Sequence, residues 1–395
     1  MSSQKVPLLI LGTCTLIAFG FLFFLNNKPY FFNSNLKEEE CVQFAKKIET
    51  SIEQNDASLL NSVLNHHAFL KKVAKNIGTY NKTQLVELAF QAKENIRFGD
   101  MVMSYLKSND GYFNFTKFYK NKNTPHIIFR IYSQMEGLNY FDCELKRING
   151  KINITDVFIY YAGELWSTSY SRHMKMLAEN NFGSIENIHP KNEFHNSLLK
   201  VDYINDLLFI GEIEQATLVF ESIPAAFQND KIIHGASLKI AHQKNDSAYV
   251  KAIQRYLSIE PDNEVLHLFF NVLQNLAAKK NPEIRQSITA LNKKTGPDSL
   301  MQLFVGQSFQ NESDFRKAIE CFDSVINRYP DLFETYWYKL VALIELENYS
   351  EAILFLDTIM ISFEAKKIDL DDLLIDYPEF INSDIYLDWR NLTNI

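Results

Sequence analysis

The chain has 395 residues, of which 46% are hydrophobic and 22% are charged, and its formal net charge is −8. This length favours two domains with appended segments over a single core, and the composition is that of a globular protein and not of a disordered one. The negative charge, without a basic stripe of interleaved aromatics, argues against a nucleic-acid partner.

The cysteines are few and widely spaced, at Cys14, Cys41, Cys143 and Cys321. No Cys-x-x-Cys or His-rich spacing occurs, so the sequence predicts neither a metal site nor a cofactor. A disulfide between Cys41 and Cys143 would require export from the cytoplasm. Separately buried thiols are the interpretation that we favour.

Residues 1–35 are predicted to form a tail and a membrane anchor, with one transmembrane helix over residues 6–25. These twenty residues carry no charge, and a helix of this length spans roughly 30 Å, the thickness of the hydrocarbon core. A cleavable signal peptide is the alternative. Its apolar region is normally shorter and is followed by a small-x-small site, whereas Asn26, Asn27 and Lys28 follow this one. The sequence therefore predicts a single-pass membrane protein.

The orientation of the anchor depends on the charges that flank it. Lys5 lies on one side of the apolar run, and Lys28 and Lys37 lie on the other, so basic residues do not decide it. The short N-terminal tail favours the cytoplasm for the tail. The remaining chain is then predicted to be extracytoplasmic.

Residues 36–165 are expected to form an α+β domain that begins with helices. Helical spacing of apolar residues predicts helices over residues 38–53, over a short segment capped by Asp56, and over residues 69–77. A fourth helix is expected to start at Thr83.

The hydrophobic period then changes to that of strands. Antiparallel strands are expected at residues 101–107, 112–119, 126–132, 138–147 and 152–161. Asp110-Gly111 and Asn149-Gly150 are typical two-residue hairpin turns. Helices followed by about five such strands predict helices on one face of a curved sheet.

This order of elements, with a turn at Asn55-Asp56, resembles the cone-shaped fold of nuclear transport factor and the polyketide cyclases. The resemblance implies an enzyme, a ligand binder or an interaction module, without choosing among them. Enzymes of this kind place an Asp–His or Asp–Tyr pair inside the cone, for which the candidates are His66, His67, Tyr140, Asp142 and Asp156.

Most of these candidates have simpler interpretations. The adjacent His66 and His67 point to different faces of any regular element, which suits a surface helix end. Asp142 alternates with Phe141 and Cys143 and is expected to face solvent if those two are core. Tyr140, like Tyr160, is expected to pack between strands.

Asp156 is the candidate that stands out for ligand binding. On a regular strand it would share a face with Ile154 and Phe158, as a single carboxylate among apolar neighbours. No Gly-rich phosphate loop, His-Glu-x-x-His motif or nucleophile elbow occurs. The sequence therefore does not predict an enzyme, although it leaves the cone-like domain open to one.

Residues 166–196 are expected to connect two domains. A helix is predicted over residues 165–178, and a polar stretch with Gly183 and Pro190 follows it.

A period of 34 residues organises the next part of the chain, residues 197–363. Ala216, Tyr249, Ile284, Ala318 and Ala352 are 33, 35, 34 and 34 residues apart. Each is expected at the contact point of a second helix; the matching places in the first helices are Ile204, Ser237, Val272, Gly306 and Leu340. This pattern resembles the tetratricopeptide repeat, which implies an all-α solenoid of five repeats.

Two of the repeats depart from the pattern. Tyr249 and Ile284 replace the small residue of the second helix, so these units are expected to be weaker or to pack at altered angles. The unit with Gly306 and Ala318 follows the pattern best, with Phe322 on the same helix face and Pro330 closing it.

Residues 364–395 are predicted to be an acidic cap. A solenoid needs a polar end for solubility, which is a simpler explanation of the acidic residues than a docking tail. Four aromatic residues would attach the cap: Tyr377, Phe380, Tyr386 and Trp389.

The first helices of such arrays line a concave groove in which partners bind. The alignment of units places six candidate partner-binding residues there: Phe269, Leu273, Leu303, Gln307, Trp337 and Val341. Because they are mainly apolar, they suit a helix or an extended apolar peptide. A role in the core between repeats is an equally good interpretation.

Together these features predict a membrane-anchored scaffold that binds a protein or peptide partner through the tetratricopeptide groove. One alternative is small-ligand binding or catalysis by the cone-like domain. Another is a chaperone-like accessory of protein export, which would hold unfolded clients.

Overall fold

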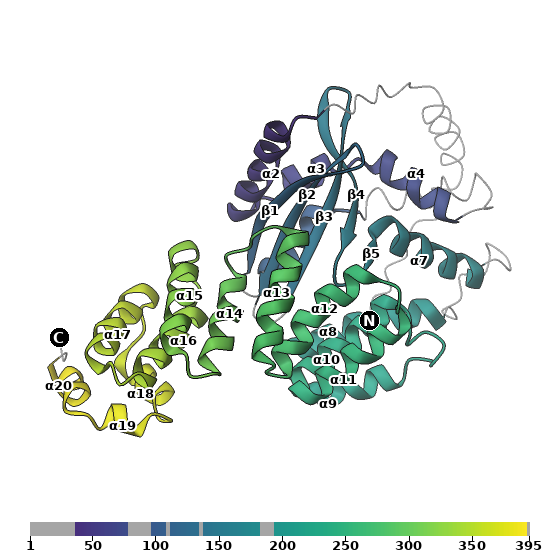
Figure 1. Ribbon diagram of the computed structural model, residues 1–395. Coiled ribbons are helices and arrows are strands. Elements are labelled where there is room, and N and C mark those ends of the chain that lie inside the picture. Colours follow the sequence, from purple (N-terminus) through teal and green to yellow (C-terminus); the bar gives the residue numbers. More distant parts are fainter. Residues whose placement is uncertain (1–35, 78–95, 108–110, 134–136, 182–192, 393–395) are drawn as a thin grey trace, which may run out of the picture. The chain divides into compact units, whose positions relative to one another are not determined.

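The computed structural model describes residues 36–77, 96–107, 111–133, 137–181 and 193–392 (Figure 1). The chain divides into two compact units. The first unit holds the α+β domain and the helices up to Leu266, apart from Tyr249–Ile253. The second unit holds Tyr249–Ile253 and the chain from His267 onward.

The α+β domain begins with helices α2 (Glu38–Glu53), α3 (Ser58–Val63) and α4 (His66–Ile77), close to the predicted positions. Asn55 adopts a φ of 60° in the turn between α2 and α3, a conformation that asparagine tolerates well. Asp56 accepts a hydrogen bond from the backbone N–H of Ser58 at 2.7 Å, which starts α3. The fourth predicted helix, from Thr83, lies outside the described residues.

The prediction of a strand over residues 101–107 is wrong, because this segment belongs to helix α6 (Phe98–Lys107). Val102, Met103 and Leu106 are the buried residues of its second half. Their spacing of one and three residues fits one face of a helix and does not alternate as in a strand. Helix α6 precedes β1, so Asp110-Gly111 does not connect two strands as predicted; Asp110 itself lies outside the described residues.

One antiparallel sheet follows, with the order β1-β2-β3-β4-β5. Its strands are β1 (Tyr112–Asn121), β2 (Thr124–Ser133), β3 (Gly137–Ile148), β4 (Lys151–Ile159) and the short β5 (Glu164–Leu165). The predicted turn at Asn149-Gly150 is confirmed, with φ of 50° and 78° at its two residues, as a type I′ hairpin requires. Four predicted strands are thus confirmed, and β5 replaces the fifth.

The helices cover one face of the sheet, as expected, and an apolar core fills the space between them. Phe113 and Phe129 stack with ring centroids 4.6 Å apart, and Phe98 of α6 meets Phe141 of β3 edge-on at 5.4 Å. Such aromatic pairs add to the stabilisation from burial. All four of these rings are at most 4% exposed.

Cys41 and Cys143 both belong to this core, and both thiols are free and fully buried. Burial raises the pKa of Cys41 to about 11 and that of Cys143 well above its usual value. Since only the thiolate reacts readily, these two cysteines are inert packing residues.

Helix α7 (Trp166–Asn181) forms the first part of the predicted connector, residues 166–196, and packs against α4 and β4 of the α+β domain. The rings of Trp166 and Phe69 lie 5.1 Å apart. Ser171 donates a hydrogen bond to the carbonyl of Val73 at 3.2 Å.

The chain from Glu193 to Phe363 is a series of helical hairpins shared between the two units, and each hairpin comprises a first and a second helix (Figure 1). The first helices are α8 (Glu193–Phe209), α10 (Lys231–Lys244), α12 (Glu264–Ala277), α14 (Met301–Gln310) and α16 (Phe333–Glu345). The second helices are α9 (Ile213–Glu221), α11 (Asp246–Ile259), α13 (Asn281–Thr295), α15 (Phe315–Arg328) and α17 (Tyr349–Phe363).

Each contact residue of the 34-residue pattern lies in the helix predicted for it. Gly306 shows why a small residue is needed: a Cβ at this position would lie 2.4 Å from the ring of Phe322. Phe322 and Ala318 are fully buried on α15. The missing side chain of Gly306 thus makes room for a phenylalanine from the second helix.

The C-terminal cap consists of α18 (Lys367–Leu373), α19 (Pro378–Ile381) and α20 (Asp384–Leu392). As predicted, aromatic residues attach it: Phe380 is fully buried against Tyr349, and Trp389 donates from its ring N–H to Asp357 at 2.7 Å. Tyr349 and Asp357 are both on α17, so these contacts place the cap on a second helix.

Among the helices of the described residues, none is long and apolar enough to cross a bilayer. The predicted span, residues 6–25, lies outside the described part of the chain.

Candidate functional site

The six predicted partner-binding residues divide into two groups. Three are core side chains, with at most 9% of their surface exposed: Phe269, Leu303 and Val341. Three are half-buried: Leu273, Gln307 and Trp337. The interpretation as core between repeats therefore holds for the first group, because apolar residues on a first helix also face the neighbouring helices. A partner can contact only the second group in this conformation.

Asp156, the ligand-binding candidate, is fully buried and bonded to protein groups. One carboxylate oxygen accepts from the Ser167 hydroxyl at 2.6 Å, and the other accepts from the backbone N–H of Ser167 at 3.2 Å. Lys72 Nζ lies 3.4 Å away. Ser167 is the second residue of α7, so Asp156 places a negative charge at the positive end of that helix. Its contacts are those of an anchor for α7.

The prediction that Asp156 shares a strand face with Ile154 is wrong. The register of β3 and β4 shifts at Thr155, an extra residue on β4. Ile154 and Val157 therefore both point into the core, and Asp156 does not share a face with Ile154.

The other sequence candidates have plain structural roles. His66 begins α4, as the surface-helix interpretation requires, and its Nε2 lies 2.9 Å from the carbonyl of Ile96. Tyr140 and Tyr160 are buried, with ring centroids 5.6 Å apart, which confirms their packing role.

The sheet face opposite the core carries a polar cluster of Tyr119, His126 and Asp142. Asp142 lies 2.8 Å from Nδ1 of His126 and accepts a hydrogen bond from the Tyr119 hydroxyl. The rings of Tyr119 and His126 stack at 4.9 Å. Asp142 lies on the face away from the core, but the prediction that it faces solvent is wrong, because it is only 8% exposed.

Sequence reasoning missed this cluster because it depends on strand register. Tyr119 pairs with His126, whereas Asp142 pairs with Ile128, so the three polar residues meet diagonally across β1, β2 and β3. The sequence does contain one indication of it: on each strand, the polar residue lies on the face opposite to the core residues, as the alternation of side chains along a strand predicts.

The cluster has a defined chemical capacity. An ionised carboxylate only accepts hydrogen bonds, so the proton of a neutral His126 lies on Nδ1 and its Nε2 keeps a lone pair. Burial and the nearby charge of Asp142 raise the pKa of Tyr119, which stays a neutral phenol and a donor. The arrangement can therefore accept a proton at Nε2 of His126.

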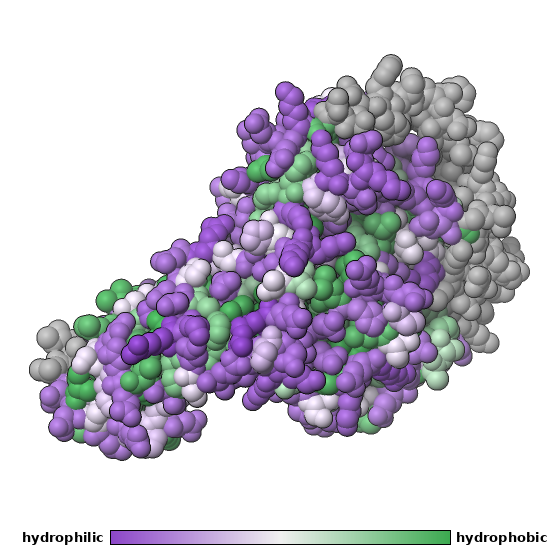
Figure 2. Space-filling view, in the orientation of Figure 1, coloured by the Kyte–Doolittle hydropathy of each residue, from purple (hydrophilic) through white to green (hydrophobic). Residues whose placement is uncertain are grey.

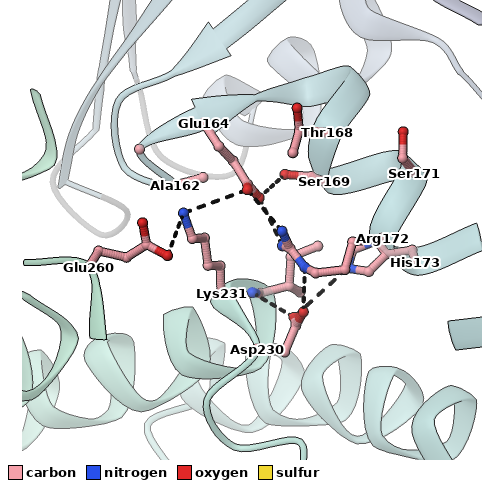
Figure 3. A network of polar contacts seen from close by, with 12 residues as sticks. Ala162, Glu164, Thr168, Ser169, Ser171, Arg172, His173, Asp230, Lys231 and Glu260 are labelled. Atoms are coloured by element: carbon pink, nitrogen blue, oxygen red, sulfur yellow. Dashed lines mark hydrogen bonds and ion pairs between the residues drawn. The ribbon is translucent and has the colours of Figure 1, made fainter. Parts of the chain in front are cut away.

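A second polar network joins the α+β domain to the first helical hairpins within the first unit (Figure 3). Arg172 of α7 makes two hydrogen bonds of 2.8 Å to Glu164 of β5 and one of 2.9 Å to Asp230 at the start of α10. Lys231 lies 3.6 Å from Glu164 and 3.1 Å from Glu260. We call these five residues the junction network.

The charges of the junction network alternate along its length. Asp230 and Glu164 are 2% and 10% exposed at their side chains, where an unpaired carboxylate would be costly. Burial alone would raise the pKa of Asp230, but His173 and Arg172 outweigh it and lower that pKa to about 2. Burial alone would also raise the pKa of Glu164, but hydrogen bonds from Arg172 and Ser169 lower it below its usual value.

The turn before β5 adds neutral contacts to this junction. Tyr256 of α11 donates to the carbonyl of Ala162 at 3.3 Å, and the Asn263 side chain donates to the carbonyl of Gly163 at 2.7 Å. Gly163 has a φ of 62°, and a Cβ there would lie 2.7 Å from Asn263. The junction is therefore closely packed as well as charged.

Comparison with protein-family models, curated proteins and solved structures finds no match. Any function must therefore be argued from the residues themselves.

Several large apolar side chains are exposed on the surface of the described residues. In Figure 2, hydrophobic patches interrupt the hydrophilic surface over the C-terminal helices. On α17 the most exposed apolar residues are Leu354 and Ile361, at 68% and 82%. On α8 and directly after it, four large apolar residues are more than half exposed: Leu199, Tyr203, Phe209 and Ile210.

Proposed function

We propose that the protein is a membrane-anchored scaffold whose helical array, of the tetratricopeptide type, holds a protein or peptide partner. The anchor is residues 6–25, and the remaining chain is extracytoplasmic. In this proposal the α+β domain, of the nuclear-transport-factor-like type, is a rigid platform for the array.

The observation that carries this proposal is that three successive first helices each keep one predicted binding residue partly accessible. Leu273 of α12 and Gln307 of α14 are 34 residues apart and both half-buried. Trp337 of α16 is also half-buried, and its apolar neighbours hold it in place. A partly exposed tryptophan on a rigid helix is the type of residue that dominates binding energy in many interfaces.

The position of the cap supports the same proposal. Phe380 and Trp389 of the cap contact α17, the second helix of the last hairpin. Partners of such arrays bind on the first helices. These two cap contacts therefore involve a different helix from the one that carries Trp337, although Trp337 packs against the same apolar cluster as the cap.

The test is recovery of a partner from native membranes by crosslinking and mass spectrometry. We expect Trp337→Ala to weaken partner binding about 30-fold or more, as for a central aromatic anchor. Leu273→Ala should weaken it less. Phe269→Ala is unsuitable, because this buried residue would report on folding.

Leu354→Ala is the matched control, since it removes an exposed apolar side chain from a second helix of the same unit. Equal recovery from Trp337→Ala and from the unchanged chain would contradict the proposal. Recovery of many unrelated unfolded proteins, with little dependence on Trp337, would favour a chaperone-like accessory instead.

A chemical role for the α+β domain is the second candidate, favoured by the hydrogen bond between Nδ1 of His126 and the carboxylate of Asp142, which accepts it. Such a pair presents an oriented base at His126 Nε2. The test is a thermal-shift screen of small molecules against the full chain. A stabilising compound should lose its effect in His126→Asn and keep it in His66→Asn; loss in neither variant would exclude the cluster as its site.

A further inference from the structure

Helix α8 is apolar on two opposite sides. Its buried side carries Phe194, Val201, Ile204 and Leu208, which pack in the core of the first hairpins. A helix at the surface of a folded protein normally shows water a polar face. On α8 the exposed side instead carries Leu199 at 53% and Tyr203 at 54% exposure.

The exposed apolar residues form one stripe. Ile210 follows the helix directly, and its backbone N–H still bonds to the carbonyl of Asp206, as in a helical turn. With 3.6 residues per turn, Leu199, Tyr203 and Ile210 therefore lie within about 40° of one another around the helix axis. Ile210 is 67% exposed, and Phe209 beside it is 61% exposed.

Acidic residues border this stripe. Asp202 and Asp206 are exposed and lie within about 60° of Leu199 around the axis of α8, along one edge of the stripe. Residues 193–222 contain six acidic residues and one lysine, Lys200. The amine of Lys200 donates to the carbonyl of Ser222 at 2.8 Å. Within the described chain, neither Asp202 nor Asp206 has an ion pair.

We infer that this surface, Leu199, Asp202, Tyr203, Asp206, Phe209 and Ile210, docks a basic amphipathic helix of a partner protein. The apolar stripe matches anchors repeated at three and four residues on such a helix. The two aspartates match lysine or arginine beside those anchors. The site goes beyond the proposed groove, because it is in the first unit and uses none of the residues tested through Trp337.

The charge decides against a lipid surface as the occupant. Anionic headgroups attract lysine and arginine near a membrane, and this stripe presents carboxylates instead. A second copy of the chain would bring another acidic stripe to the first, which like-charge repulsion disfavours.

The experiment uses the full chain in zwitterionic lipid nanodiscs and a synthetic helical peptide with leucine on one face and lysine on the other. Binding is measured by fluorescence anisotropy at two salt concentrations, with empty nanodiscs in parallel. Hydrogen exchange locates the bound peptide. We expect saturable binding, protection of residues 196–210 and weaker affinity at high salt.

Variants test each part of the surface. Leu199→Ala with Tyr203→Ala should weaken binding at least tenfold, and Asp202→Asn with Asp206→Asn about two- to fivefold, with a smaller salt dependence. Leu354→Ala, which changes an exposed apolar residue of the second unit, should bind as the unchanged chain does.

Several results would overturn the inference. They are equal binding by the stripe variants, equal binding of a peptide with glutamate in place of lysine, and binding explained by empty nanodiscs. Protection of residues 196–210 without peptide, caused by anionic lipid or by raised protein concentration, would identify a membrane or a second copy as the occupant. If the proposed function failed, and no partner that depends on Trp337 were found, the peptide experiment on α8 could still succeed or fail independently.

Discussion

The two units stabilise similar helical hairpins by different physical means. In the first unit, the junction network sets buried carboxylates against Arg172 and Lys231 between the α+β domain and the helices that follow. In the second unit, α14 and α15 pack closely because Gly306 has no side chain and leaves room for the ring of Phe322. One contact depends on charge, and the other depends on shape.

This difference predicts where each unit is vulnerable. A buried ion network loses stability when one charge is removed or neutralised, because the partner charge is left unpaired. A packed contact is indifferent to pH and responds to changes in volume. The division between the units falls within α11 and α12, and Tyr249 of α11, which replaces the small residue of the repeat, lies at it.

The largest effect is expected for Phe322→Ala, which empties the contact with Gly306. Loss of a fully buried phenylalanine should lower the free energy of unfolding of the second unit by about 3–5 kcal/mol. Urea titration followed by hydrogen exchange measures each unit separately. Ile361→Ala, at an exposed site on α17, should change stability little; a similar loss in both variants would contradict a packing role for Phe322.

The next effect is expected for Arg172→Met, which removes the central charge of the junction network but keeps an apolar stem. Leaving Glu164 and Asp230 without their partner should cost the first unit about 3 kcal/mol. Arg97→Met is the matched control in the same unit, since both partners of the ion pair of Arg97 with Asp100 are more exposed and the pair should contribute under about 1 kcal/mol. Equal losses would show that burial of the network is unimportant.

The sequence predicted those features that depend on local periodicity. Helix α2, the turn at Asn149-Gly150 and the positions of Gly306 and Ala318 each follow from residues near one another in the chain. The prediction for residues 101–107 was wrong because their aromatic and apolar content suggested a strand, whereas the spacing of Val102, Met103 and Leu106 fits a helix.

The candidate sites were less predictable, because they depend on contacts between distant segments. The bond between Asp142 and His126 requires the register of β2 and β3, and the bulge at Thr155 decides where Asp156 points. Likewise, Arg172 and Asp230 are 58 residues apart, and no sequence pattern links them. Burial of Phe269 and Leu303 depends on neighbouring helices in the same way.

A smaller effect is expected for Gly306→Ala, which adds one methyl group against the ring of Phe322. Overpacking of this kind should cost the second unit about 1–3 kcal/mol. Combination with Phe322→Leu tests the cause, since a smaller side chain gives the new methyl group room. The double variant should lose less stability than the sum of the single variants; simple additivity would show that the two residues do not compete for space.

The smallest effect is the acid sensitivity of the first unit. The pKa of Asp230 is about 2 in the folded chain against 3.8 as its usual value, so its contribution is complete above about pH 4 and is lost as the pH falls towards 2. By pH 3 the first unit should have lost about 1 kcal/mol from this residue alone. Asp230→Asn should remove that part of the slope, although it lowers stability at neutral pH.

The second unit is the internal reference, and the Gly306–Phe322 contact there should not respond to Asp230→Asn at any pH. If hydrogen exchange showed the slope unchanged in Asp230→Asn, the ion pairs of Asp230 would not be the source of the acid sensitivity.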